Sequence, residues 1–344
     1  MRAPNSRVRT DRSLPSPYGY ASPAASVDFA ILGAGGSIGN AVARRARLGG
    51  HAVRAVVRRA EPRLGLPPGT EVHAADLLDA RAVVAACDSA DVIVHAANAP
   101  YSEWPKLVPA MAQNALRAAE AAGALLVLPG NVYVYGRAQS NPVREDHPRE
   151  PHTLKGRIRL RIEEEWLRAH KEGRARVLIP RYPDFYGPNV VNELMRPIFE
   201  GALAGRPCGW PINADVDHEF ILIDDAAAAL LSLVQRPAAH GHVVHVPGPG
   251  PVHAREFIRL AYKSGGHTPR LRVYSRATMR AAGIFNRTVR AAMEMSYLFE
   301  NPLLLDGSLY RTLTGSPHPA TPYAEGARRT VEWFRTHLAS AKPT

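Results

Sequence analysis

The fold is decided by Phe29-Ala30-Ile31-Leu32-Gly33-Ala34-Gly35-Gly36-Ser37-Ile38-Gly39, where an apolar strand runs through a glycine turn into a helix. Gly33 permits the tight turn, Gly36 lets the backbone approach a pyrophosphate, and Gly39 lets the helix pack closely on the strand. Ser37 and Ile38 follow Gly36, and the first N–H groups of the helix expected from about Ile38 offer a partial positive charge to phosphates. A turn that served packing alone would leave the spacing of the three glycines unexplained, so the stretch predicts a dinucleotide site.

Outward from this turn, short apolar strands alternate with helices. We expect strands at 27–32, 51–57, 71–75, 91–96, 124–128 and 176–179, and helices at 38–48, 80–87, 104–122 and 158–170. Continuous apolar strands separated by helices are typical of a parallel sheet that is covered on both faces. Because the crossovers are right-handed, the predicted fold class is α/β with a doubly wound parallel sheet.

The remaining sequence divides the chain into parts. Residues 27–187 form the expected dinucleotide-binding domain, and 188–344 mainly form a small substrate lobe, with some segments returning to the core. In that second part we expect helices at 193–204, 224–235 and 254–263 and a strand at 242–246. Residues 1–26 are rich in Arg, Ser and Pro and lack hydrophobic periodicity, so we expect a disordered tail.

Composition narrows the function classes. The net charge is +12, but no Lys/Arg run is interleaved with aromatic residues, which disfavours nucleic-acid binding. No stretch is apolar enough to span a membrane. The two cysteines and the histidines have no metal-ligand spacing, and no disulfide framework is expected. These features predict a cytoplasmic protein with a small-molecule substrate, without a nucleic-acid or membrane partner or a metal, and they leave homodimerisation open.

The end of the second strand indicates which dinucleotide binds. An NAD site usually places Asp or Glu there to accept a hydrogen bond from the ribose 2′-hydroxyl. Here the strand runs directly into Arg58 and Arg59, and guanidinium groups suit a 2′-phosphate dianion. The sequence therefore favours NADP over NAD, with an exposed arginine pair at a strand end as the alternative interpretation.

Several further motifs follow in an order that is itself informative. Together they are Gly33-x-x-Gly36-x-x-Gly39, Asp76-Leu77, His95-Ala96-Ala97, Val132-Tyr133-Val134-Tyr135-Gly136, Arg181-Tyr182-Pro183-Asp184-Phe185-Tyr186-Gly187-Pro188 and Phe220-Ile221-Leu222-Ile223-Asp224-Asp225. In this order the chain resembles the extended short-chain dehydrogenase/reductases, also called the NAD-dependent epimerase/dehydratase family. The resemblance implies a Rossmann-type fold and a nicotinamide cofactor.

That resemblance also implies which other residues lie beside the cofactor. The matching positions are Leu77, Ala96, Ala97 and Arg181. Asp76 is expected either to accept a hydrogen bond from the adenine amino group or to cap the following helix.

The resemblance fails at the family's catalytic residues. Active members use a Ser/Thr, a Tyr that exchanges a proton with the substrate oxygen as hydride moves, and a Lys that lowers the Tyr pKa. Counted from the neighbouring motifs, these positions fall on Asn131, Lys155 and Arg159. No Tyr lies between Gly136 and Tyr182, so the usual Tyr-x-x-x-Lys pair is missing.

Three hypotheses for the chemistry remain open. In the first, the Asn131 amide binds the substrate oxygen, Lys155 donates the proton, and Arg159 holds ribose hydroxyls. In the second, Tyr133 or Tyr135 donates the proton from the strand-five side. In the third, the chemistry is lost and the chain is a silent NADP(H)-binding sensor. The first choice is an atypical NADP(H)-dependent oxidoreductase acting on a small-molecule carbonyl or secondary alcohol.

A nucleotide-sugar epimerase or dehydratase is a further alternative. Relatives that act on such substrates usually hold the diphosphate with an Arg at the position of His218, which here lies between Asp217 and Glu219. Many also have an Asn at the position of Asp184. Because these acidic groups repel a diphosphate, the sequence disfavours this class.

Overall fold

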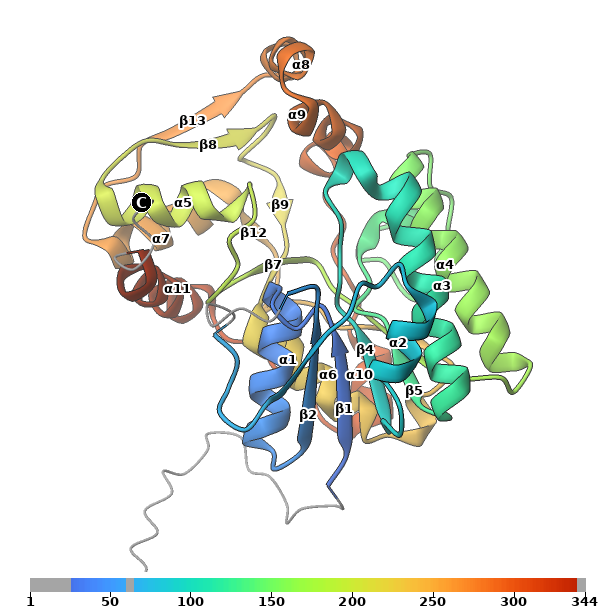
Figure 1. Cartoon of the computed structure of the whole chain (residues 1–344). Coiled ribbons are helices and arrows are strands. Elements are labelled where there is room, and N and C mark those ends of the chain that lie inside the picture. The colour runs from blue at the N-terminus through green and yellow to red at the C-terminus, as the bar shows by residue number, and fades with distance from the viewer. Residues whose placement is uncertain (1–25, 60–64, 339–344) are drawn as a thin grey trace, which may run out of the picture.

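A seven-stranded parallel sheet forms the centre of the molecule (Figure 1). The computed structural model describes residues 26–59 and 65–338, so almost all of the predicted tail lies outside the described residues. The strand order is β11-β6-β5-β4-β1-β2-β3. The strands are β1 (Asp28–Leu32), β2 (Ala52–Val57), β3 (Glu71–Ala74), β4 (Val92–His95), β5 (Leu125–Val127), β6 (Arg176–Arg181) and β11 (Val243–His245).

Alternate residues of the strands enter two separate hydrophobic cores. Phe29 and Ile31 of β1 pack on one face, while Ala30 and Leu32 pack on the other. The first face is covered by α1 (Ser37–Leu48) and α6 (Ile223–Val234), and the second by α2 (Ala80–Ala86), α3 (Trp104–Ala122) and α4 (Leu154–Lys171). The predicted doubly wound sheet is therefore confirmed.

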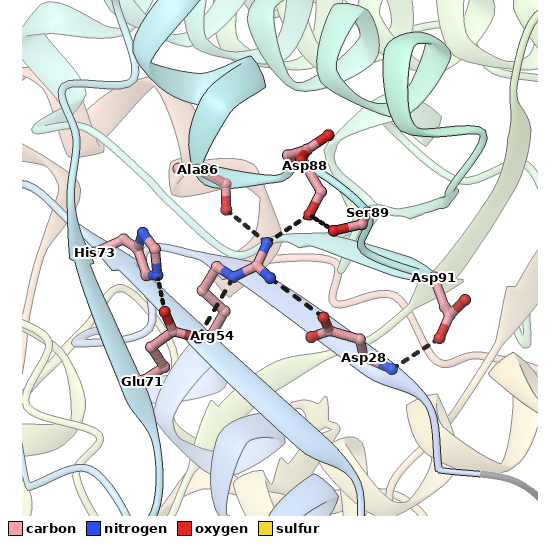
Figure 2. A network of polar contacts seen from close by, with 8 residues as sticks. All are labelled: Asp28, Arg54, Glu71, His73, Ala86, Asp88, Ser89 and Asp91. Carbon is pink, nitrogen blue, oxygen red and sulfur yellow. Dashed lines mark hydrogen bonds and ion pairs between the residues drawn. The ribbon is translucent and has the colours of Figure 1, made fainter.

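Arg54 of β2 ties several elements together at the amino edge of the sheet (Figure 2). Its guanidinium donates to the Ala86 and Asp88 carbonyl oxygens, at 3.2 and 2.8 Å, beyond the end of α2. It also pairs with Asp28 of β1 at 3.3 Å and approaches Glu71 of β3 at 3.8 Å. These contacts join the amino ends of β1, β2 and β3 to the end of α2.

A second lobe follows β6. It contains α5 (Met195–Ala204), α7 (Ala254–Gly265), α8 (Arg276–Phe285), α9 (Arg287–Ala292) and α11 (Tyr323–Leu338). Its strand pairs are β7 (Asp184–Tyr186) with β10 (Phe220–Leu222), β8 (Cys208–Pro211) with β13 (Leu271–Tyr274) and β9 (Asp217–His218) with β12 (Val252–His253). The helix α10 (Ser308–Thr314) instead contacts α6 and β11. Within the described residues, short 3-10 helices lie at Tyr101–Glu103 (η2), Val132–Tyr135 (η3), Pro237–Ala239 (η4) and Met293–Phe299 (η5). From this part of the chain, α6 packs on α1 and β11 joins the central sheet.

Two sequence predictions are corrected here. The helix expected at 158–170 begins at Leu154, because Thr153 accepts a hydrogen bond from the Gly156 N–H and caps it. The elements β13, α8, α9 and α10 were not predicted. β13 is mostly exposed and α8 buries only Gly283, so neither element adds a run of buried apolar residues to the core.

Candidate dinucleotide site

The glycine turn lies where the chain order of the sheet reverses, between β4 and β1. Gly33 has φ +83°, and a Cβ there would stand 2.6 Å from the Ala97 Cα. A Cβ on Gly39 would stand 2.5 Å from the Gly33 carbonyl oxygen. Both positions therefore require glycine, one for the turn and one for the close approach of α1 to it.

Gly36 differs from the other two glycines, because it is exposed and its backbone is extended. A Cβ there would meet only the Gly33 carbonyl oxygen, at 3.4 Å. Gly36 also caps α1 without a side-chain hydrogen bond, so the first N–H groups of the helix are not taken by a cap. The Ser37 hydroxyl donates to the Asn189 carbonyl oxygen at 2.7 Å, and Ile38 is buried. This cradle fits a pyrophosphate.

The expected 2′-phosphate residues, Arg58 and Arg59, lie just beyond β2 at the carboxyl edge and are exposed. Neither forms an ion pair with another described residue. Asp76 is exposed and accepts a hydrogen bond from the Leu78 N–H at 3.0 Å. The alternative that Asp76 caps the next helix is wrong, since Asp79 caps α2 by accepting from two N–H groups of its first turn.

Small residues follow β4. The Ala96 N–H donates to the Leu32 carbonyl oxygen at 2.9 Å, and Ala97 packs against Gly33. Leu77, like both alanines, is partly buried. The residues expected around the glycine turn are thus gathered at one edge of the sheet, next to β1.

Arg181 and Tyr135 lie in a closed network instead. The Arg181 guanidinium is fully buried, pairs with Glu163 at 2.7 Å and lies 4.9 Å from the centre of the Tyr135 ring. Arg181 also donates to the Asn131 carbonyl oxygen. The Tyr135 hydroxyl is 2.5 Å from His245 Nε2, and burial lowers the pKa of that histidine to about 3. The predicted roles of Arg181 toward the cofactor and of Tyr135 as a proton donor would require this network to open.

Lys155 has partners that the sequence did not indicate. Its ammonium group lies 2.6 Å from the Glu294 carboxylate and donates to the Ala291 carbonyl oxygen at 2.9 Å. The Lys155 N–H donates to the other Glu294 oxygen at 3.0 Å. The side chain is only 5% exposed, and it links the start of α4 to the segment formed by α9 and η5.

Asn131 and Arg159 are the other two residues that the sequence predicts at catalytic positions. The Asn131 side chain accepts from the Tyr133 N–H at 3.2 Å and so caps η3. Arg159 is buried, with its guanidinium carbon 4.8 Å from the centre of the Trp104 ring. Burial lowers the pKa of Arg159, although Glu163, Tyr133 and Tyr101 act in the opposite direction.

A pair of tyrosine hydroxyls completes the site. Tyr101, in η2, lies after β4, and its hydroxyl is 2.7 Å from that of Tyr133. Asp184 is solvent-accessible, yet the protein around it raises its pKa to about 6 by desolvation. Its carboxylate is near enough to raise the pKa of both tyrosines. Sequence comparison missed Tyr101, because it lies outside the family motifs.

The residue at the family's diphosphate-binding position lies in an aromatic core. The His218 ring is 5.1 Å from that of Trp210 and stacks 5.9 Å from that of Phe220. Burial lowers the pKa of His218 to about 4 and raises that of Glu219 to about 7. Glu219 accepts a hydrogen bond from the Leu305 N–H at 3.0 Å.

Neither cysteine takes part in a disulfide. Cys87 and Cys208 are free and buried, and burial raises the pKa of Cys87 to about 12. Within residues 26–59 and 65–338, no helix has the length and apolar character to cross a membrane. The same part of the chain contains no cluster of three or more His, Cys, Asp or Glu side chains arranged to hold a metal ion.

Comparison with known families decides the assignment. The model of the NAD dependent epimerase/dehydratase family matches residues 29–246, more than half of the chain. The chain belongs to the NAD-dependent epimerase/dehydratase family. The resemblance drawn from the motifs is therefore confirmed, and the sequence has no Tyr between Gly136 and Tyr182.

Many solved structures share the epimerase/dehydratase fold. An epimerase from Methanothermobacter thermautotrophicus gives a TM-score of 0.76 at 16% identity, over 92% of this chain and 94% of that one. UDP-glucose 4-epimerase from Thermotoga maritima, solved with UDP-glucose, gives a TM-score of 0.74 at 16% identity, over 90% of this chain and 99% of that one. dTDP-glucose 4,6-dehydratase from Streptomyces venezuelae, solved with NAD, gives a TM-score of 0.74 at 19% identity, over 92% of this chain and 99% of that one. No curated protein sequence matches.

Proposed function

We propose that this family member is an atypical NADP(H)-dependent oxidoreductase that interconverts a carbonyl and a secondary alcohol of a small molecule. The observation that carries the proposal is the open cradle at Gly36, combined with the exposed Arg58 and Arg59 at the same edge of the sheet. A pyrophosphate fits the first feature, and a 2′-phosphate fits the second. NAD, which several solved neighbours bind, is the alternative cofactor.

Different residues would hold different parts of the cofactor. The turn from Gly33 to Gly39 would bind the pyrophosphate through N–H groups, and Arg58 and Arg59 would bind the 2′-phosphate. Ala96 and Ala97 would leave room for the nicotinamide half on the β4 side of the crevice. When bound, the nicotinamide supplies or accepts the hydride; the chain must orient the substrate and move the proton.

The charges beside the tyrosine pair bear on the substrate. Asp184 and Glu193 both raise the pKa of Tyr101, so both carboxylates lie within electrostatic reach of its hydroxyl. Ionised carboxylates there repel a diphosphate and favour a neutral or cationic molecule. His218 offers no cation in compensation, since it lies among Trp210 and Phe220.

A second candidate is a nucleotide-sugar epimerase or dehydratase. It is supported by the similarity in fold to enzymes solved with UDP-glucose or UDP-glucuronic acid. A third, the silent NADP(H)-binding sensor, is supported by the missing Tyr-x-x-x-Lys pair.

Calorimetric titration followed by turnover assays separates these functions. We expect NADPH to bind, and we expect a panel of aldehydes and ketones to consume it, as followed by the absorbance of the reduced nicotinamide. Tight binding without consumption by any carbonyl would support the sensor. Turnover of a UDP-sugar or dTDP-sugar without net consumption of cofactor would support the epimerase/dehydratase alternative.

A further inference from the structure

Tyr101 and Tyr133 meet on the half of the crevice where the nicotinamide would lie. Tyr101 follows β4 and Tyr133 follows β5, and these strands are neighbours in the sheet. The glycine turn follows β1, which lies on the other side of β4. A dinucleotide whose pyrophosphate lies at that turn extends one half toward β2 and the other toward β4 and β5. The hydroxyl pair is therefore on the side opposite to Arg58 and Arg59.

The two hydroxyls share one hydrogen bond, so one of their two O–H groups is not used in it. They are 2.7 Å apart, and only one O–H can point along the line between them. The other hydroxyl accepts that hydrogen bond and keeps its own O–H for a third partner. Both side chains are partly exposed, so a substrate oxygen can be this third partner.

Burial and the hydrogen bond between the hydroxyls both act on the pKa of each tyrosine. Burial raises the pKa of Tyr101, and the hydrogen bond with Tyr133 opposes this increase. Burial also raises the pKa of Tyr133, and there the bond with Tyr101 adds to the increase. The 2.7 Å geometry fits either direction of this hydrogen bond, and when Tyr133 donates, Tyr101 keeps its own O–H for a substrate.

Charged groups from several elements face Tyr101. Arg159 of α4 lowers its pKa, whereas Asp184 of β7 and Glu193 before α5 raise it. The Lys155 ammonium lies 5.0 Å from the centre of the Tyr101 ring, and Glu294 holds that ammonium group in place. Arg159, at the family's Lys position, is thus coupled electrostatically to a tyrosine from another element.

We propose that Tyr101 is the catalytic acid and base of this protein, with Tyr133 and Arg159 as positioning residues. The proposal rests on the proposed oxidoreductase function. In carbonyl reduction, the carbonyl carbon gains a hydride from the reduced nicotinamide and the carbon–oxygen π bond breaks. The substrate oxygen takes the Tyr101 proton, which gives an alcohol and a phenolate. The phenolate accepts a hydrogen bond from Tyr133 and regains a proton from water.

Single substitutions test the role in turnover. Tyr101→Phe should lower kcat by about 100-fold or more, the usual contribution of a general acid, while the Kd of NADPH changes less than about 3-fold. The control is Tyr274→Phe, at an exposed tyrosine of β13 whose loss should leave kcat unchanged. A Lys155→Met variant that loses turnover while Tyr101→Phe retains it would overturn the proposal in favour of Lys155.

A titration in the absence of cofactor tests the hydroxyl pair independently. Tyrosine labelled isotopically at the ring carbon that bears the hydroxyl reports each phenol by NMR, and Tyr101→Phe assigns the relevant signal. Tyr133→Phe and Arg159→Met should each raise the pKa of Tyr101, because each removes a group that lowers it. The alkaline limb of the pH profile of carbonyl reduction should move to higher pH in the same variants.

The outcomes distinguish the two proposals. A wild-type protein that reduces carbonyls, together with a Tyr101→Phe variant that does so equally well, overturns the role of Tyr101 alone. An unchanged pKa of Tyr101 in Tyr133→Phe overturns the hydroxyl pair. A wild-type protein that binds NADPH but reduces no carbonyl overturns the oxidoreductase function, and the role of Tyr101 with it.

Discussion

The two ends of β2 carry arginines in opposite situations. Arg54, near the amino edge, contacts β1, β3 and the end of α2 (Figure 2). Arg58 and Arg59, just beyond the carboxyl end, are exposed and have no ion-pair partner among the described residues. The side chains are chemically the same, but only the second group has donors left for a ligand.

The same difference separates arginines that have buried acceptors inside the protein from exposed arginines elsewhere in the molecule. Arg181 belongs with Arg54, because it pairs with Glu163 and both side chains are fully buried. The amino edge and the β6 interior supply their own acceptors, whereas the carboxyl edge next to the glycine turn does not. The cofactor half of the site is therefore open, and the network around Tyr135 is closed.

The largest expected effect is at Arg181. Arg181→Met leaves the Glu163 carboxylate buried without its main partner, which should lower the free energy of unfolding by about 3–5 kcal/mol. Urea denaturation measures this loss, and Arg176→Met, at the exposed start of the same strand, should cost less than about 1 kcal/mol. A stable Arg181→Met variant with weakened cofactor binding would instead make Arg181 a cofactor ligand.

The next effect is at the glycine turn. Gly36→Val places a branched side chain where the pyrophosphate must approach, so the Kd of either cofactor should rise by about 100-fold or more. The melting temperature should change little, since a Cβ at Gly36 meets only one atom, at 3.4 Å. Gly39→Ala is the contrasting variant and should destabilise the fold, because its Cβ would stand 2.5 Å from the Gly33 oxygen. A folded Gly36→Val variant that still binds would show that the cradle is assigned wrongly.

A smaller effect is expected at Arg58, just beyond the carboxyl end of β2. Arg58→Ala should erase most of the preference for NADPH over NADH, about 10-fold in Kd, by removing a guanidinium from the 2′-phosphate. Calorimetry with both cofactors measures the ratio of the two Kd values. Arg54→Ala is the matched control on the same strand, and it should lower stability but keep the preference. Equal or tighter binding of NADH by the wild-type protein would contradict the assignment of NADP.

The smallest effect concerns Asp184 and pH. Its pKa in the folded protein is raised by desolvation to about 6, above the unfolded value of about 3.9. Folding therefore favours its protonated form, and stability is lost as the pH rises from about 4 through about 6. Asp184→Asn should gain stability relative to wild type over that interval and keep a constant advantage above it. Urea denaturation across the interval checks this, and a pH-independent difference would place Asp184 in ordinary solvent.

The sheet and the glycine turn could be predicted from the sequence because their causes are local. Continuous apolar runs such as 29–32 define the strands, and the glycine turn packs on itself, since a Cβ on Gly39 would stand 2.5 Å from the Gly33 carbonyl oxygen. The same holds for Arg58 and Arg59, whose position follows directly from the end of β2.

The catalytic half could not be predicted in the same way, because its contacts join residues far apart in the chain. Lys155 was expected to be a proton donor, yet its partner is Glu294, more than a hundred residues later. Tyr135 and Tyr133 are equivalent in the sequence pattern, but one meets His245 and the other Tyr101. Only the folded arrangement shows which of these hydroxyls has an open side.

The most direct test of the account is a crystal structure of the complex with NADPH. We predict that the 2′-phosphate contacts Arg58 or Arg59, that the pyrophosphate lies against Gly36, and that the reactive carbon of the nicotinamide faces the Tyr101–Tyr133 pair. A complex in which the nicotinamide lies against Lys155, away from both tyrosines, or in which Arg181 leaves Glu163 to bind the cofactor, would contradict it.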